Sequence, residues 1–200
     1  EKKFTRLKEI EIQVGRTGVL TPLALLEPVF LAGSTISKAT LHNMDYIRER
    51  DIRIGDLVQI MKAGDVIPAV VSVDREARIQ ERGTVPRTEF TMPEACPECG
   101  GAVLREAGEA AFRCTNPECP AKIYRGLIHF TSKDAMNIEG LGPAVLRVLC
   151  DQGLITGIGD IYRLKDRRAE LIGIERMGEK SVENLLNSIE NTKKNELYRL

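Results

Sequence analysis

The chain has 200 residues, of which 42% are apolar and 4% aromatic, and its 29 basic residues balance its 29 acidic ones. This length suits two or three small modules. The low aromatic content argues against a base-stacking surface as the main mode of nucleic-acid binding. The zero net charge gives no indication of a polyanionic partner. No apolar run approaches the roughly 18 residues of a membrane span, and no signal peptide opens the chain, so we expect no membrane partner and a cytoplasmic protein.

The first part of the chain, residues 8–91, is rich in strand patterns. The segment EIEIQVG at 9–15 alternates apolar and polar side chains, as a strand with one buried face does. Two apolar runs follow at 18–33, where Pro22 and Pro28 interrupt them.

One short helix is predicted at 39–50, because its apolar residues fall on one helical face. Those residues are Leu41, Met44 and Ile47. Two further strands are predicted at 56–64 and 66–74, joined at the turn dipeptide Gly64-Asp65. Several short strands with one helix are typical of a small closed barrel of the oligonucleotide-binding (OB) type.

Four of the five cysteines form two close pairs: Cys96, Cys99, Cys114 and Cys119. Two residues separate the first pair and four the second, and the fourteen residues between the pairs are enough for a short hairpin. Gly100 and Gly101 allow the chain to turn away from the first pair. We predict a closed structural zinc site of four thiolates, without which so short a segment would not fold. Disulfide bonds, which the lack of a secretion signal disfavours, and four unrelated thiols are the alternatives. Cys150 is expected to be a small buried apolar residue.

From about residue 123 the pattern becomes helical, with apolar residues three and four positions apart. Segments 138–149 and 174–186 form a weak repeat, and each has the form of a helix-hairpin-helix. In the first copy, Gly140 and Gly142 enclose a tight turn, and a helix is predicted to begin near Pro143.

The second copy keeps Gly178 and has Arg176 in place of the first glycine. Lys180 and Ser181 could add phosphate contacts there. Glycines let the backbone approach a ligand closely, and the free amides of the following helix attract a phosphate whatever the base sequence. An ordinary helix–helix connection is the alternative for each turn.

No catalytic arrangement is recognisable in the chain. His42 is expected to pack or to cap the short helix, His129 is not needed as a metal ligand, and Asp65 is expected to be a turn residue. We find no pair of carboxylates suited to acid–base catalysis, no Ser-His-Asp set and no phosphate-binding P-loop.

Residues 14–43 and 54–71 closely resemble the OB domain of bacterial NAD-dependent DNA ligases, through VGRTGVLTPLALLEPVFLAGSTISKATLHN and IGDLVQIMKAGDVIPAVV. The cysteine pairs and the hairpins follow in that family's order. The fold class is therefore predicted to be α+β and multidomain. We expect an OB barrel at 1–91, a four-cysteine zinc finger at 92–122 and a truncated helix-hairpin-helix region at 123–200.

The resemblance implies an enzyme of DNA replication and repair that seals nicks in duplex DNA. A lysine attacks NAD to form lysyl-AMP, AMP passes to the 5′-phosphate, and the 3′-hydroxyl displaces it with the help of magnesium. That lysine lies in a Lys-x-Asp-Gly motif, which this chain lacks. We therefore expect no catalytic residue here and no activity from this segment alone. The adenylation domain would be its partner in one parent chain, and the resemblance implies that a full set of four hairpins and a terminal BRCT domain would lie beyond Leu200.

By resemblance, Arg16, Thr17 and Lys62 are the barrel residues nearest the nick, with Arg16 and Lys62 supporting catalysis through phosphate positioning. Relatives often carry arginine in place of Lys62. In this chain the point charge of an ammonium group therefore replaces a guanidinium that can donate two parallel hydrogen bonds. Val66 and Ile67 would press on the floor of the minor groove, or else belong to strand core.

We expect the zinc finger to fix the angle between barrel and hairpins, and the protein to be a monomer. Two other functions stay open from the sequence. One is a non-catalytic, zinc-containing DNA-binding adaptor of recombination or repair. The other is a purely structural zinc module with a protein partner, for which no salt-dependent affinity for DNA is expected.

Overall fold

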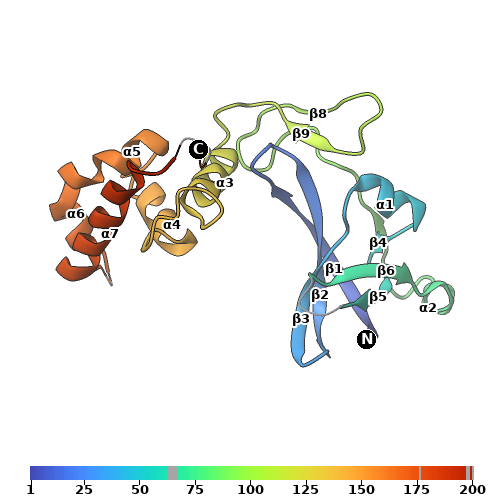
Figure 1. Ribbon diagram of the computed structural model, residues 1–200. Helices are drawn as coiled ribbons and strands as arrows, with labels where there is room; N and C mark the ends of the chain where they lie inside the picture. Colours follow the sequence, from blue (N-terminus) through green and yellow to red (C-terminus); the bar gives the residue numbers. More distant parts are fainter. Residues whose placement is uncertain (63–66, 176, 197–198, 200) are drawn as a thin grey trace. The chain divides into compact units, whose positions relative to one another are not determined.

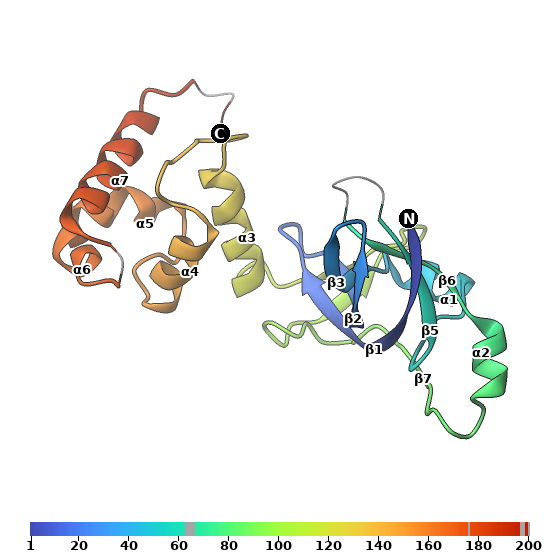
Figure 2. The same ribbon diagram turned by 90° about the horizontal axis from the view of Figure 1, so that it is seen from below.

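The computed structural model describes residues 1–62, 67–175, 177–196 and 199 (Figures 1 and 2). The chain divides into two compact units, Glu1–Cys119 and Pro120–Leu200, and each has its own hydrophobic core. The predicted fold class is confirmed, since a closed barrel and a four-cysteine hairpin form the first unit and helices form the second. The module boundaries given above stay a prediction.

The barrel has five strands in the order β1-β2-β3-β6-β5. Their bounds are β1 (Lys2–Val14), β2 (Leu20–Leu31), β3 (Ser34–Thr40), β5 (Leu57–Met61) and β6 (Ala69–Val73). The long β1 pairs with β5 through its first half and with β2 through its second half. A parallel contact between Thr40 and Ala69 closes the barrel. Alternate side chains of these strands, such as Leu7, Ala24 and Ile60, fill its interior.

β2 is one continuous strand, although Pro22 and Pro28 interrupt its apolar pattern. Pro22 lies opposite Ile12 in the ladder with β1, and Pro28 lies where the register with β3 shifts. Proline cannot donate to a ladder, and Pro28 lies at an irregular position where proline is tolerated. The two apolar runs of the sequence are therefore the two halves of one strand.

The helix after β3 is shorter than predicted. α1 (Met44–Glu49) occupies only part of 39–50, because β3 takes the first residues of that span. The Asn43 side chain begins the helix by accepting a hydrogen bond of 2.8 Å from the backbone N–H of Tyr46. Leu41 is buried as expected, but it lies before the helix.

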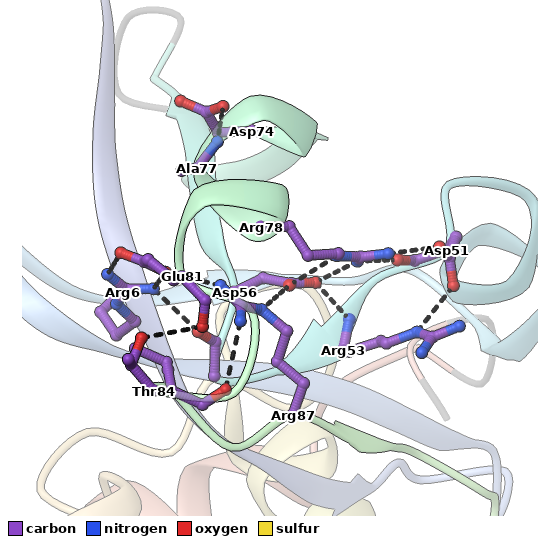
Figure 3. Close-up of polar contacts among 12 residues, drawn as sticks. Arg6, Asp51, Arg53, Asp56, Asp74, Ala77, Arg78, Glu81, Thr84 and Arg87 are labelled. Atoms are coloured by element: carbon purple, nitrogen blue, oxygen red, sulfur yellow. Dashed lines mark hydrogen bonds and ion pairs between the residues drawn. The ribbon is translucent and has the colours of Figure 1, made fainter.

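A buried ion network fastens the chain beyond β6 to the barrel (Figure 3). α2 (Arg75–Gln80) supplies Arg78, and the segment after it supplies Arg87. The Nε atoms of these two arginines lie 2.9 and 3.0 Å from Oδ1 of Asp56, whose side chain is fully buried. The backbone N–H of Arg53 donates to the other oxygen of Asp56 at 2.8 Å.

The same network includes a second carboxylate, Glu81 (Figure 3). It accepts hydrogen bonds of 2.7 and 2.8 Å from Arg6 and one of 2.5 Å from Arg87. The bonds from Arg6, followed by those from Arg87, lower the pKa of Glu81 to about 2. A small sheet of β4 (Arg53–Ile54) and β7 (Thr88–Glu89) extends this attachment.

The hairpin predicted between the cysteine pairs is present. It consists of β8 (Val103–Arg105) and β9 (Phe112–Cys114), with Val103 opposite Cys114. Arg105 of this hairpin pairs with Asp45 of α1 at 2.6 Å.

The second unit is helical, as predicted from residue 123 onward. Its elements are α3 (Pro120–Thr131), α4 (Pro143–Asp151), α5 (Ile158–Arg163), η1 (Leu164–Arg167), α6 (Arg168–Ile172) and α7 (Glu179–Thr192). Residues of all these elements share one core, which includes Leu127, Leu146, Ile161, Leu171 and Leu185. Among the described residues, no helix has both the length and the apolar character that a membrane crossing requires.

Candidate metal centre and nucleic-acid interface

The four paired cysteines converge on one point in the first unit. Their Sγ atoms all lie within 4.8 Å of one another, with 4.0 Å between Cys96 and Cys119 and 3.6 Å between Cys99 and Cys114. A tetrahedral zinc site with Zn–S bonds of about 2.3 Å separates its sulfurs by about 3.8 Å, so this donor set fits the ion. The alternative of disulfide bonds is wrong, because these sulfur–sulfur distances of 3.6 and 4.0 Å are far longer than the about 2.05 Å of a disulfide bond.

Two glycines shape the first cysteine pair. Gly100 has a φ of +70°, and a Cβ at Gly101 would lie 3.3 Å from Sγ of Cys99 and 3.0 Å from Cβ of Asn116. The N–H of Gly101 donates to the Cys99 sulfur at 3.4 Å and thereby lowers its pKa to about 7. Burial raises the pKa of Cys114 to about 12. A bound cation would hold every sulfur as a thiolate, so metal binding releases protons.

The loop containing Arg16 and Thr17 is a tight turn between β1 and β2. The N–H of Gly18 donates to the carbonyl of Gly15 at 2.9 Å, and the N–H of Gly15 donates to the carbonyl of Val19 at 2.8 Å. Position 18 requires glycine, because its φ is +84°. Arg16 and Thr17 are exposed, and Arg16 has no side-chain partner within the described ranges. This guanidinium is therefore available to a ligand.

Lys62 lies at the end of β5, partly buried, and its ammonium group donates to Oγ of Ser34 at 3.1 Å. Ser34 begins β3, so the bond connects the end of β5 to the start of β3. The alternative of strand core is wrong for Ile67, which precedes β6 and is 70% exposed. Four residues of the predicted loop lie outside the described residues: Ala63, Gly64, Asp65 and Val66.

Two family models match this chain. The model of the NAD-dependent DNA ligase OB-fold domain covers residues 4–82, and that of the NAD-dependent DNA ligase C4 zinc finger domain covers residues 95–121. Over 200 residues the chain is 59% identical to the DNA ligase of Acetivibrio thermocellus, 53% to that of Bacillus subtilis and 52% to that of Clostridioides difficile. Residues 4–82 and 95–121 are thus the OB-fold and C4 zinc finger domains of the NAD-dependent DNA ligase family.

All of this chain aligns with these ligases, and it spans 29% of their length. Arg16, Thr17 and Lys62 fall within the match to the ligase OB fold, and the four cysteines fall within the match to the ligase zinc finger. The two hairpins lie beyond both family models but within the alignments to the whole ligases.

The first hairpin has the predicted form. α4 begins at Pro143, and Gly140 in the preceding turn has a φ of +85°. Gly142 is the N-cap of α4, and no side chain caps this helix. A Cβ added at Gly142 would meet no atom within 4 Å, so nothing in the described part of the chain demands glycine there. That space is open to an approaching ligand.

The second hairpin repeats this arrangement. Gly178 is the N-cap of α7 with φ −77° and ψ 168°, against −74° and 172° for Gly142, and no side chain caps α7 either. Lys180 and Ser181 are exposed in the first turn of α7. Arg176, the residue that replaces the first glycine, lies outside the described residues.

α5 also follows a glycine, but a carboxylate of the helix itself binds the backbone at its start. The Asp160 carboxylate accepts from the backbone N–H and the hydroxyl of Thr156 at 2.9 and 2.7 Å, and from the N–H of Gly157 at 3.1 Å. These bonds, led by the one from the Thr156 backbone, lower the pKa of Asp160 to about 2. Gly142, Gly157 and Gly178 all lack a side-chain cap hydrogen bond, but of these three helix starts only that of α5 has a carboxylate reaching back to its N-cap.

The remaining predicted residues have structural positions. His42 does not cap α1; it has a φ of +59°, and its ring packs at a tilt against that of Tyr46 with 4.6 Å between ring centroids. His129 is exposed on α3. Cys150 is partly buried against the helical core, and burial raises the pKa of its thiol.

The sequence alone did not reveal two contacts of these sites. Ser34 holds Lys62, and Arg113 of β9 reaches the loop of Thr17. In the sequence, the one sign that could have pointed to Arg113 is its position directly before Cys114.

Proposed function

We propose that this chain is the part of an NAD-dependent DNA ligase that holds nicked duplex DNA while the nick is sealed. The observation that carries the proposal is the match to both ligase-specific domains together with the alignment of the whole chain to DNA ligases. The parent enzyme transfers AMP from NAD to a lysine and then to the 5′-phosphate, and the 3′-hydroxyl completes the phosphodiester bond with the help of magnesium. None of these covalent steps uses a residue of this chain.

The barrel loops supply cations to the DNA backbone. Arg16 is exposed on a rigid turn, and its fork of N–H donors suits two oxygens of a phosphate. Lys62 adds a point charge and Thr17 a hydroxyl donor. Ile67, which is exposed, gives an apolar contact for the minor groove, and we assign Val66 to the same contact. These groups position the nick and read no base sequence.

The hairpins hold the backbone through main-chain amides. At Gly140, Gly142 and Gly178 a phosphate can approach the chain closely, and the amides of α4 and α7 then donate to it with the help of the helix dipoles. Lys180 and Ser181 strengthen the contact at α7. Two turns with matching backbone angles suit the two strands of one duplex.

Zinc has a structural role in this proposal. Cys96, Cys99, Cys114 and Cys119 would hold the ion as four thiolates, leaving no coordination position for water. The metal replaces the hydrophobic core that so short a segment lacks. We retain the proposal that this module fixes the angle between barrel and hairpins.

The alternative of a non-catalytic adaptor is less well supported. An adaptor would share zinc and hairpins with the ligases, whereas this chain matches the ligase OB domain as well and aligns with ligases from end to end. We therefore place the chain in a cytoplasmic, monomeric ligase, with the adenylation domain of the same parent as its partner and NAD as the parent's cosubstrate.

The test is binding of a fluorescently labelled nicked duplex, followed by anisotropy. We expect the affinity to fall steeply between about 50 mM and about 200 mM salt, and Arg16→Ala to reduce the slope of log affinity against log salt by about 1. Arg82→Ala is the matched control, since Arg82 is exposed and has no side-chain partner in the residues described. An affinity that does not respond to salt, or equal slopes for the two variants, would refute the assignment.

A further inference from the structure

We propose that β9 of the four-cysteine hairpin positions the loop containing Arg16 and Thr17, with Arg113 as a positioning residue. Metal binding at Cys114 and DNA contact at this loop are then coupled within the first unit. The inference rests on the proposed function only in that Arg16 and Thr17 contact DNA. The physical coupling of the loop to the metal site stands apart from it.

The first observation is a backbone connection between the two sites. β9 runs beside the end of the β1–β2 hairpin (Figure 1), and Val19 pairs with Arg113 in an antiparallel bridge. The N–H of Cys114 donates to the carbonyl of Gly18 at 2.9 Å. β9 therefore adds an edge strand at the base of the turn, 96 residues away in sequence from Thr17.

The second observation concerns the side chain of Arg113. Its Nη1 lies 3.5 Å from Oγ1 of Thr17, while Nη2 and Nε lie 3.2 and 3.3 Å from Oε2 of Glu109. The carboxylate of Glu109 holds the planar guanidinium in one orientation, so that its other edge faces the turn. Arg113 thereby limits the positions open to Thr17, and through it to Arg16.

The link to the metal follows from Cys114 itself. This residue offers its sulfur to the metal site and its backbone N–H to Gly18. When the Cys114 sulfur is bound to the metal, the backbone of Cys114 is fixed. The carbonyl of Gly18, which accepts from the Cys114 N–H, is then fixed as well. Without the metal, Cys114 would hold the carbonyl of Gly18 less firmly, and the turn would depend more on its own two bonds, between Gly18 and Gly15 and between Gly15 and Val19. A loop held by fewer contacts opens more often.

The first test needs no DNA. Amide hydrogen exchange is followed by NMR in the zinc-loaded chain and after removal of zinc with a chelator. We expect exchange at Gly15, Gly18 and Cys114 to become roughly tenfold faster or more on metal removal, while amides between β1 and β2, such as those of Glu11 and Leu23, keep their rates. Unchanged exchange at Gly15 and Gly18 would overturn the proposal, as would an equal increase throughout the barrel.

The second test uses zinc-loaded variants and the labelled nicked duplex. Arg113→Ala should weaken binding roughly threefold to tenfold, and should have no further effect when Arg16 and Thr17 are both alanine, because the two sites are coupled. Arg105→Ala is the matched control, since Arg105 lies on the partner strand of the same hairpin and pairs with Asp45 instead. Zinc content per chain should be the same in every variant.

The outcomes separate this inference from the proposed function. If Arg113→Ala weakens binding equally whether or not Arg16 and Thr17 are present, or no more than Arg105→Ala does, Arg113 is not a positioning residue. If Arg16→Ala leaves binding unchanged while zinc still slows exchange at Gly18, the coupling stands and the DNA contact of the loop is refuted.

Discussion

At the scale of single residues, arginine has two opposite roles in this chain. Arg16 is exposed on a tight turn without a side-chain partner in the part of the chain described, so its charge is available to a phosphate. Arg78 and Arg87 are 18% and 9% exposed and are committed to the buried Asp56 (Figure 3). The difference arises from the surroundings, because the side chains are chemically the same.

Removing the Asp56 carboxylate should therefore be costly. We expect Asp56→Ala to lower the free energy of unfolding by about 3–5 kcal/mol, because two guanidinium groups lose their buried counter-charge. In the matched control, Asp45→Ala, which breaks the more exposed pair with Arg105, the loss should stay within about 1 kcal/mol. Urea unfolding followed by circular dichroism measures both. Similar losses in the two variants would mean that the network contributes no more than a surface pair.

A second substitution tests the first hairpin. Gly142→Asp adds a negative charge where a Cβ meets no atom within 4 Å, so the fold should tolerate it. We expect affinity for nicked duplex to fall roughly tenfold, equivalent to about 1.4 kcal/mol, through repulsion of the phosphate, with no loss of zinc. Gly142→Asn, which has the same size and no charge, should weaken binding less. Equal binding by wild type and Gly142→Asp in the anisotropy titration would count against this contact.

At the scale of elements, the structure separates helix starts that are closed by the chain from those left open. α5 is capped by Asp160, whereas α4 and α7 begin at glycines without any capping side chain. A cap stabilises the fold, and an uncapped start leaves amides for a ligand. This contrast favours the two hairpins, and not α5, as backbone contacts for DNA.

The cap on α5 should make stability depend on acid pH. The folded pKa of Asp160 is about 2, below the value of about 3.9 expected in an unfolded chain. The contribution of Asp160 to the free energy of unfolding is therefore full above about pH 4 and is lost as the pH falls toward 2. We expect Asp160→Ala to cost about 1 kcal/mol at neutral pH, and the difference from wild type to vanish near pH 2. Thermal unfolding across this range measures it; a difference that stays constant would contradict the cap.

A control for that experiment is Asp151→Ala. Asp151 forms an exposed pair with Arg147 of the same helix, at 3.8 Å, and its side chain is 66% exposed. Such a pair contributes little, so this variant should follow the wild-type profile.

At the scale of the whole molecule, we propose that this chain supplies the parts of a ligase that hold DNA, and its sequence lacks the motif that reacts with NAD in that family. No Lys-x-Asp-Gly sequence occurs in its 200 residues. We expect no protein–AMP adduct after incubation with labelled NAD, while a complete ligase from a relative such as Bacillus subtilis should become labelled in parallel. A stable adduct on this chain, resistant to denaturation, would show that the adenylation site lies here after all.

Much of the architecture could be predicted from short patterns. The cysteine spacing predicted the convergence of four sulfurs, and Pro143 after Gly142 predicted the start of α4. Local propensity failed where tertiary pairing competes with it. Leu41 continues the apolar spacing of a helix, yet β3 takes the residues before it into the barrel, and Asn43 starts the helix later.

The sequence by itself determined the modules, their order and their family, because strand alternation, cysteine spacing and glycine turns are properties of neighbouring residues. Only the tertiary structure decided which charges are free and which are buried, and that β9 reaches the loop of Thr17 from 96 residues away. Those facts depend on contacts between distant segments, which form only when strands and helices pack around a shared core.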